Sequence, residues 1–255
     1  MKAIILAAGV GSRMGAITRD FPKCLLEVQG GSILDTQVRA FRENDIEEIH
    51  IVLGHKAELV REVAEPLGLI CWKNERYAST GMLESLYSAW DALEGDVIVS
   101  YGDTFLRPRV VGELVNSDAQ LGLAAAPWIG QEAERVESAF QGEVELGLRK
   151  GSTKVLCRGN VVKRISKDIQ SEPQCEVLEY IGVFKSSGES TSLLRQKVSS
   201  AVEQKLTAAA PSPSYLFSDL LKEGFLLTAV RIAADDYAEC DYPEDWEQAK
   251  TTFCL

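Results

Sequence analysis

Short apolar runs alternate with amphipathic stretches through the first half of the chain. The apolar runs have the length and composition of buried strands, and the stretches between them have the spacing of helices that bury one face. This alternation predicts a parallel sheet covered by helices on both faces. The expected order is strand 2–7, helix 32–44, strand 49–53, helix 57–65, strand 69–73, helix 82–93, strand 96–101 and helix 108–116.

The second half of the chain is less regular at first. Residues 129–160 are polar and contain several glycines between short alternating runs, so we expect a small β-arm or lid there. Regular α/β structure then resumes, and residues 1–255 form one expected domain whose closing strand–helix element spans 225–255. The elements expected after the arm are strand 177–184, helices near 189–203 and 213–222, strand 225–232 and helix 243–252.

Composition limits the classes of partner. The chain has 255 residues, of which 45% are apolar and 25% charged, so it can bury a full core as an ordinary globular protein. Its formal net charge of -11 argues against a surface that coats nucleic acid. A protein this acidic must bring positive charge to a phosphate locally. Single arginines and lysines near glycine turns are therefore candidates for function.

Six cysteines are scattered without a C-x-x-C pair, which argues against a zinc site and a disulfide framework and favours a reducing cytoplasm. The N-terminal apolar run ends in glycine and is too short for a signal peptide. No apolar stretch approaches the length of a membrane span, so no membrane partner is expected. We therefore expect a cytoplasmic protein. A homodimer is one assembly that the sequence leaves open.

The turn LAAGVGSRMG, residues 6–15, ends the first predicted strand and has three interpretations. A dinucleotide fingerprint would need glycine where Met14 stands, and an acidic residue closing a second strand, whereas Asp35 lies in a helical pattern. A P-loop would need Gly-Lys-Ser/Thr, which is absent. A structural turn without a ligand is the third interpretation, and the residues around the turn weigh against it.

The whole pattern L-A-A-G-x-G-x-R, followed by Pro22-Lys23, resembles the signature of the nucleotidyltransferases that activate sugar phosphates and related small phosphates. Small residues let backbone N–H groups approach a base and a triphosphate. In this resemblance Arg13 clamps the β- and γ-phosphates, and Lys23 follows the α-phosphate as charge develops. The residues that would bind the nucleotide here are Leu6, Ala7, Ala8, Gly9, Gly11 and Ser12.

Two acidic segments match the places where such enzymes bind Mg²⁺, which prefers one or two carboxylates together with water and phosphate oxygens. Asp103 follows the buried strand at 96–101, and a carboxylate at the carboxyl end of a central strand faces the ligand crevice. Asp241 matches the second metal aspartate, and Glu239 lies on the same strand face. Glu244 and Asp245 are expected to cap the last helix instead.

The nucleobase is held, in these relatives, before and within the first turn of the helix predicted at 82–93. Thr80, Gly81 and Ser85 fit this role, since the turn is small and a helix N-terminus offers free N–H groups. Helix capping by Thr80 is the alternative.

The run VVKRISKDI at 161–169, followed by EYIGVF at 179–184, resembles the phosphocholine and phosphonate cytidylyltransferase branch. Lys167 would approach the acceptor there. The resemblance implies a Rossmann-like, doubly wound α/β/α domain with a mixed, mostly parallel sheet. It implies transfer of CMP from CTP to a small phosphate or phosphonate, with release of pyrophosphate and with Mg²⁺ as cofactor.

The acceptor stays open among several classes. A quaternary ammonium such as choline would need an aromatic box, while choline-type relatives carry an asparagine pair where this chain has Thr80-Gly81. Aminoalkyl and hydroxyalkyl phosphonates are therefore candidate acceptors on the same footing as phosphocholine. The main alternative function is a sugar-1-phosphate nucleotidyltransferase that uses UTP, dTTP or GTP. A Ser-His-Asp hydrolase is disfavoured, because the only histidines, His50 and His55, are expected to be loop or packing residues.

Overall fold

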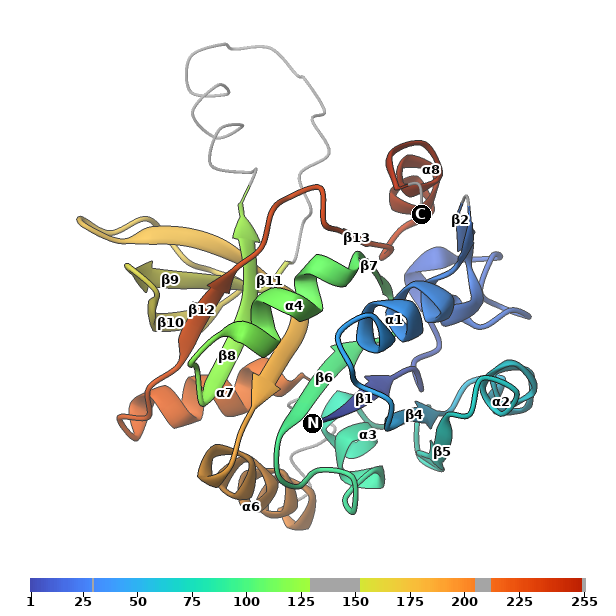
Figure 1. The fold of residues 1–255 in the computed structure, drawn as a ribbon, viewed down its shortest axis with the longest axis horizontal. Coiled ribbons are helices and arrows are strands. Elements are labelled where there is room, and N and C mark those ends of the chain that lie inside the picture. Colours follow the sequence, from blue (N-terminus) through green and yellow to red (C-terminus); the bar gives the residue numbers. More distant parts are fainter. Residues whose placement is uncertain (29, 129–151, 205–211, 254–255) are drawn as a thin grey trace.

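The computed structural model describes residues 1–28, 30–128, 152–204 and 212–253. Within these residues the core is a nine-stranded sheet in the order β5-β4-β1-β6-β11-β8-β12-β10-β9 (Figure 1). Its first half is parallel, as the sequence predicts, because each of these strands pairs in parallel with its neighbour. These strands are β1 (Lys2–Leu6), β4 (Ile49–Leu53), β5 (Ile70–Lys73) and β6 (Val97–Tyr101).

The second half of the sheet is mixed. Strand β11 lies antiparallel between β6 and β8, β12 is parallel to β8, and β10 and β9 follow in antiparallel order. Strand β9 also pairs with β11, so these five strands close a circuit. Their bounds are β8 (Leu121–Pro127), β9 (Lys154–Arg158), β10 (Val161–Ser166), β11 (Glu176–Ser186) and β12 (Thr228–Arg231).

The structure differs from the sequence expectation in this half. Residues 121–127 form a strand, although alanine and glycine are poor strand formers, because β11 and β12 flank this segment on both sides. The expected β-arm at 129–160 lies outside the described residues up to 151. Its remaining part contains β9, which belongs to the main sheet.

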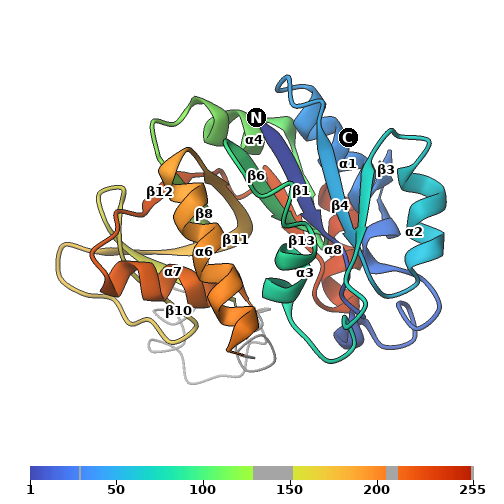
Figure 2. The ribbon, with the colours of Figure 1, turned by 90° about the horizontal axis from the view of Figure 1, so that it is seen from below.

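Helices cover both faces of the sheet. Alternate residues of β1 point to opposite sides: Ala3 and Ile5 join one core cluster with α1, α2 and α4, and Ile4 and Leu6 join another with α3, α6 and α7. Helices α1 and α4 lie in front of the sheet in Figure 1, and α3 and α6 in front of it in Figure 2. The helices are α1 (Ile33–Arg42), α2 (Ala57–Ala64), α3 (Met82–Ser88), α4 (Pro108–Asn116), α6 (Glu189–Glu203), α7 (Pro213–Lys222) and α8 (Pro243–Thr252).

Helix α3 is shorter than the expected helix at 82–93. It ends at Ser88, whose hydroxyl donates a hydrogen bond of 2.9 Å to the Glu84 carbonyl and so competes with the regular helical pattern. The following turns still bury Ala89 and Leu93. The apolar stripe therefore indicated the buried face correctly but not the end of the helix.

A short two-stranded sheet brings the C-terminal segment to the end of β6. Strand β13 (Tyr237–Glu239) pairs antiparallel with β7 (Thr104–Leu106), and the Cys240 N–H donates to the Asp103 carbonyl at 2.9 Å. Helix α8 then lies beside the hairpin formed by β2 (Glu27–Val28) and β3 (Gly31–Ser32). This connection positions residues 239–241 next to residue 103.

Among the described residues, no helix combines the length and the apolar character needed to cross a membrane.

Gly102 sets how closely β6 approaches β1, because its amide donates to the Leu6 carbonyl at 2.9 Å. A Cβ at this position would lie 2.9 Å from the Cα of Ala7, which is backbone and cannot move aside. We expect Gly102→Ala to lower the free energy of unfolding by about 1–3 kcal/mol, as overpacking does. Gly9→Ala is the matched control, since a Cβ there meets nothing within 4 Å. Equal urea midpoints for the two variants would contradict the close approach.

Candidate active site

The glycine turn after β1 leaves backbone N–H groups available. Gly11 adopts a left-handed conformation with φ 67°, and only a single 3₁₀ turn, η1 (Ser12–Met14), follows it. A dinucleotide fingerprint requires a long helix at this point, whereas the next α-helix begins at Ile33. The amides of residues 9–13 donate to no backbone carbonyl of the described residues. Such a loop can receive phosphate oxygens.

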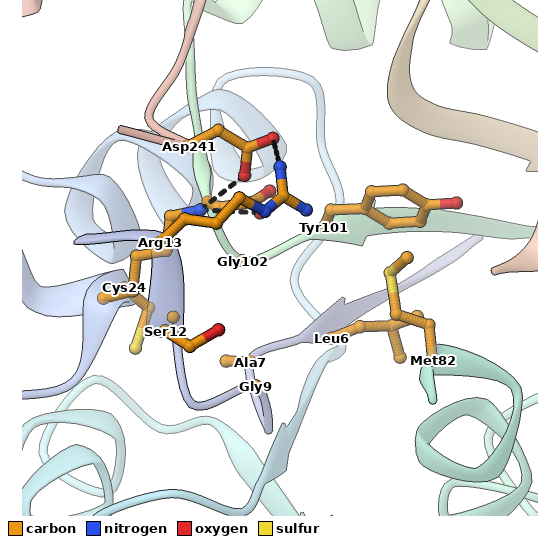
Figure 3. Close-up of a pocket in the computed structure, with 13 residues that line it drawn as sticks. Leu6, Ala7, Gly9, Ser12, Arg13, Cys24, Met82, Tyr101, Gly102 and Asp241 are labelled. Carbon is orange, nitrogen blue, oxygen red and sulfur yellow. Dashed lines mark hydrogen bonds and ion pairs between the residues drawn. The ribbon is translucent and has the colours of Figure 1, made fainter. Parts of the chain in front are cut away.

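A cavity of about 210 Å³ opens above this loop (Figure 3). It lies at the carboxyl ends of β1 and β6, which is where open α/β sheets bind ligands. The loop forms one wall, and basic and acidic side chains form another. The lining consists of Leu6, Ala7, Gly9, Gly11, Ser12, Arg13, Lys23, Cys24, Met82, Tyr101, Gly102, Asp103 and Asp241.

Lys23 joins two carboxylates that come from distant parts of the chain. Its ammonium lies 3.1 Å from Asp103 Oδ2 and 3.0 Å from Asp241 Oδ1. The lysine belongs to a 3₁₀ turn, η2 (Lys23–Leu25), that follows Pro22, and its side chain is only 11% exposed. A lysine this buried requires partners of opposite charge.

Arg13 pairs with Asp241, one of the two aspartates that Lys23 contacts. Its guanidinium Nη1 contacts Asp241 Oδ2, and Figure 3 shows the two side chains meeting at the edge of the cavity. Both predicted phosphate-binding cations therefore contact predicted metal ligands directly, an arrangement that the sequence did not predict.

The charges shift one another's pKa values. Burial alone would lower the pKa of Lys23, but the carboxylates of Asp103 and Asp241 outweigh burial and raise it well above its usual value. Burial would likewise raise the pKa of Asp241, whereas Lys23 and Arg13 lower it below its usual value. Both ions of the pair are therefore fully charged at neutral pH.

The three predicted metal ligands lie together. Asp103, Glu239 and Asp241 each offer one carboxylate oxygen within 4.8 Å of the others. The Asp241 N–H donates to Asp245 Oδ2 at 2.9 Å, so the capping residue of α8 also orients the aspartate that precedes it. Asp103 Oδ1 is buried and has no hydrogen-bond partner among the described residues. Hard carboxylate oxygens with an unused ligand atom suit Mg²⁺.

The residues expected to hold the base lie in a polar cluster around Asn74. The Asn74 amide donates to Ser85 Oγ at 3.1 Å and to Thr80 Oγ1 at 3.3 Å. Thr80 itself donates to the Arg76 carbonyl at 2.9 Å and does not cap α3, whose N-cap is Gly81 without a side-chain bond. The alternative in which Thr80 caps this helix is therefore wrong, whereas Gly81 does lie at the helix start as the sequence predicts. None of Thr80, Gly81 and Ser85 lines the cavity.

Ala8 also lies outside the lining, because it is 3% exposed and packs beneath the loop. Three lining residues were not expected from the sequence, Cys24, Met82 and Gly102, and Tyr101 was considered only as one aromatic side chain that could surround a quaternary ammonium. Tyr101 and Gly102 directly precede Asp103, so the end of the strand was a signal that could have identified them. Burial raises the pKa of the Cys24 thiol to about 12, so this cysteine stays protonated.

Lys167 is placed elsewhere. It lines a second, open pocket together with Lys154 and Arg164, and it does not line the cavity above the glycine loop. Its role toward an acceptor stays a prediction.

The aromatic residues that could surround a quaternary ammonium are dispersed. Six aromatic side chains were candidates from the sequence: Trp72, Tyr77, Tyr101, Trp128, Tyr180 and Trp246. Only Tyr101 of these six lines the cavity, and the Tyr180 ring meets the Tyr101 ring edge-on at 5.9 Å between centroids. The indole of Trp72 donates to His50 Nδ1 at 3.0 Å. The ring of Trp128 lies under the Lys154 ammonium, and the indole of Trp246 donates to the Glu27 carbonyl.

Comparisons with known proteins agree with this geometry. The sequence profile described as a MobA-like NTP transferase domain matches residues 3–184. The CTP:phosphoglutamine cytidylyltransferase of Campylobacter jejuni is 27% identical over 195 residues, which cover 73% of this chain and 73% of that protein. The choline-phosphate cytidylyltransferase of Streptococcus pneumoniae is 32% identical over 117 residues. That second match covers 46% of this chain and 51% of the relative, about half of each.

A solved structure supports the fold. The CTP:phosphocholine cytidylyltransferase from Streptococcus pneumoniae superposes with a TM-score of 0.73 at 19% sequence identity, covering 98% of this chain and 97% of that chain. The likeness confirms the expected Rossmann-like α/β architecture.

Replacing Lys23 tests the charge balance of the site. Lys23→Met keeps the length of the side chain and removes its charge, so Asp241 loses a cation that lowers its pKa, and this pKa rises. A carboxyl group whose folded pKa is raised stabilises the protein at low pH and loses that contribution as pH increases. We expect the variant to lose at least about 1 kcal/mol of unfolding free energy relative to wild type at pH 7, less than for a fully buried pair, and to recover part of it at pH 5.

Urea unfolding at the two pH values measures this difference. Lys56→Met is the matched control, because the pair that Lys56 makes with Asp20 at 3.3 Å is largely exposed and should contribute little. A loss for Lys23→Met that is the same at pH 5 and pH 7 would contradict the proposed charge balance.

Proposed function

The chain belongs to the MobA-like NTP transferase family, and from this premise we propose that it transfers CMP from CTP to a small acceptor that carries a phosphate or phosphonate group, releasing pyrophosphate. The observation that carries the proposal is the meeting of Arg13 and Lys23 with the acidic group of Asp103, Glu239 and Asp241 beside a glycine-lined cavity. Two cations lie beside three carboxylates here. The cations suit a triphosphate, and the carboxylates suit the metal ion that accompanies it.

The triphosphate is assigned to the glycine loop and the two cations. The free amides of residues 9–13 offer hydrogen bonds to phosphate oxygens. Arg13 is 54% exposed and can turn its guanidinium from Asp241 toward the β- and γ-phosphates, which it would grip bidentately. Lys23 is more confined and would contact the α-phosphate as a point charge.

Asp103, Glu239 and Asp241 would hold the magnesium ion that this class of reaction uses. When bound, Mg²⁺ neutralises charge on the triphosphate and on the departing pyrophosphate. The buried Asp103 Oδ1 is the ligand atom that the protein itself leaves without a partner among the described residues.

The transfer needs no covalent enzyme intermediate, because the acceptor phosphate is already an anion at neutral pH. One of its oxygens attacks the α-phosphorus of CTP in line, a new P–O bond forms, and the bond to the β-phosphate oxygen breaks. The protein contributes position and charge: Lys23 and the loop amides stabilise the negative charge that grows on the α-phosphoryl oxygens.

CTP is proposed as the donor because the relatives named above are cytidylyltransferases. The acceptor class comes from their names as well, which specify phosphoglutamine and choline phosphate. Short aminoalkyl and hydroxyalkyl phosphonates share the reactive group and stay within the proposal, since the scattered aromatic side chains do not single out choline.

A pyrophosphate-release screen tests the donor and the acceptor together. The four NTPs are paired with phosphocholine, phosphoglutamine, aminoethylphosphonate, a hydroxyalkyl phosphonate and glucose 1-phosphate, with Mg²⁺ present. We expect CTP to be used at least about fivefold better than UTP, because one mispaired buried polar group costs roughly 1–3 kcal/mol. Faster turnover with UTP or dTTP and the hexose 1-phosphate would replace this proposal with sugar-nucleotide synthesis.

Asp103 and Asp241 should act as a unit. Asp103→Asn and Asp241→Asn should each remove most of the activity, and the double variant should lose little more than either single one, because one ion would depend on both. Glu244→Gln is the control, since this exposed carboxylate lies three residues from Asp241 and should be silent. Losses that multiply would show that the two aspartates act independently.

A further inference from the structure

We propose that His55 and Thr18 are positioning residues that hold the glycine loop in the conformation that receives the triphosphate. The inference rests on the proposed function for its consequence, but the structural part stands on contacts alone. Neither residue lines the cavity. Both lie beneath the loop, and the sequence pattern gave His55 no role beyond packing.

Thr18 supports the left-handed residue of the loop. It is 1% exposed, and its hydroxyl donates to the Gly11 carbonyl at 2.7 Å. The Thr18 side chain also fills the space beside Gly11, where a Cβ would lie 3.3 Å from the threonine methyl. The hydrogen bond therefore fixes the peptide that follows Gly11, and this peptide leads directly into Ser12 and Arg13.

His55 ties the two ends of the loop to the sheet. Its backbone N–H donates to the Ala8 carbonyl at 3.0 Å, where the chain leaves β1. Its ring Nε2 lies 3.0 Å from the Thr18 carbonyl, where the chain returns. A carbonyl oxygen only accepts hydrogen bonds, so Nε2 carries the proton and donates. One residue thus anchors both the start and the end of residues 9–17.

The position of His55 is set by β4, which ends two residues earlier at Leu53. Gly54, between β4 and His55, approaches the loop so closely that a Cβ would lie 2.5 Å from the Ala8 carbonyl oxygen and 2.7 Å from Tyr77 Cβ. Strand β4 pairs in parallel with both β1 and β5, so it is an interior strand of the sheet, and His55 lies just beyond its carboxyl end. The position of its ring is therefore set by the fold and not by the loop.

External support matters for this loop because its own hydrogen bonds are few. The backbone bonds inside it are Met14 to Gly11, Gly15 to Ser12 and Ile17 to Met14, all in its later part. The amides of residues 9–13 donate to no backbone carbonyl of the described residues, which makes them available for phosphate but leaves this part without ties of its own. Preorganised donors bind an anion more tightly than donors that must first be ordered.

Hydrogen–deuterium exchange of the nucleotide-free protein tests the structural part. His55→Leu removes the ring donor, and Thr18→Val removes the hydroxyl with almost no change of shape. We expect exchange of the hydrogen-bonded amides in this loop, those of Met14, Gly15 and Ile17, to accelerate about fivefold to tenfold in either variant, as the loss of one net hydrogen bond predicts. His55→Gln retains an N–H donor and should restore most of the protection.

His50 provides the matched control. It lies in β4, is 4% exposed, and its ring contacts Glu48 and Trp72 instead of the loop. His50→Gln should lower the melting temperature without accelerating exchange in residues 9–17. Acceleration of that segment by His50→Gln to the same extent as by His55→Leu would show general destabilisation and overturn the inference.

Calorimetric titration with CTP and Mg²⁺ tests the consequence. His55→Leu and Thr18→Val should each weaken CTP binding about fivefold to tenfold, and the double variant should lose less than the product of the two, because both act on one loop. CTP affinity equal to that of wild type in both single variants would overturn the inference. If wild-type protein binds no CTP, the proposed function fails, and the exchange experiment still decides whether His55 and Thr18 hold the loop.

Discussion

The rest of the site depends on the pair of salt bridges that the Lys23 ammonium makes with two aspartates. The ammonium lies between Asp103 and Asp241, which are 138 residues apart in the sequence (241 less 103), and its own loop comes from the beginning of the chain. Without a cation at this point, three carboxylates within 4.8 Å would repel one another. Lys23 and Arg13 together offset two of these three negative charges, in a chain whose formal net charge is -11. When a triphosphate and its cation bind, the phosphates can take over the contacts of Arg13 and Lys23, and the cation can take over the contacts of the carboxylates.

Backbone contacts prepare this charged cluster. Small residues at the ends of β1, β4 and β6 let the chain segments approach until a single added methyl group would clash, at Gly54 and at Gly102. The loop after β1 consequently lies close to Asp103, while β13 reaches the same place through its pairing with β7. The cations come from the first loop, and the acids come from β6 and from the segment before α8. The sheet brings them together, and no local sequence contact does.

Much of the architecture followed from periodicity. The parallel strands β1, β4, β5 and β6 and most helices lie within a few residues of the expected ranges, because a buried strand needs an unbroken apolar run and a covering helix needs one apolar face. Periodicity does not predict the structure where tertiary contacts override the local preference of the residues. Strand β8 is made largely of glycine and alanine and is a strand because two neighbours pair with it. Helix α3 ends at Ser88 although the apolar stripe continues to Leu93, so the stripe does not report where the helix stops.

The sequence by itself identified the residues that are proposed to carry the chemistry. The glycine signature, Arg13, Lys23 and the three acids were recognisable because phosphate and magnesium demand particular residue types at strand ends, and the structure brings all of them to one place. Only the tertiary structure decided how they are arranged. It paired Lys23 with two distant carboxylates, separated Lys167 from the cavity, and placed Thr80 and Ser85 around Asn74. It also put His55 beneath the loop. Residue type limits what a side chain can do, but its partner is set by strand order and packing, which bring together positions that are distant in sequence.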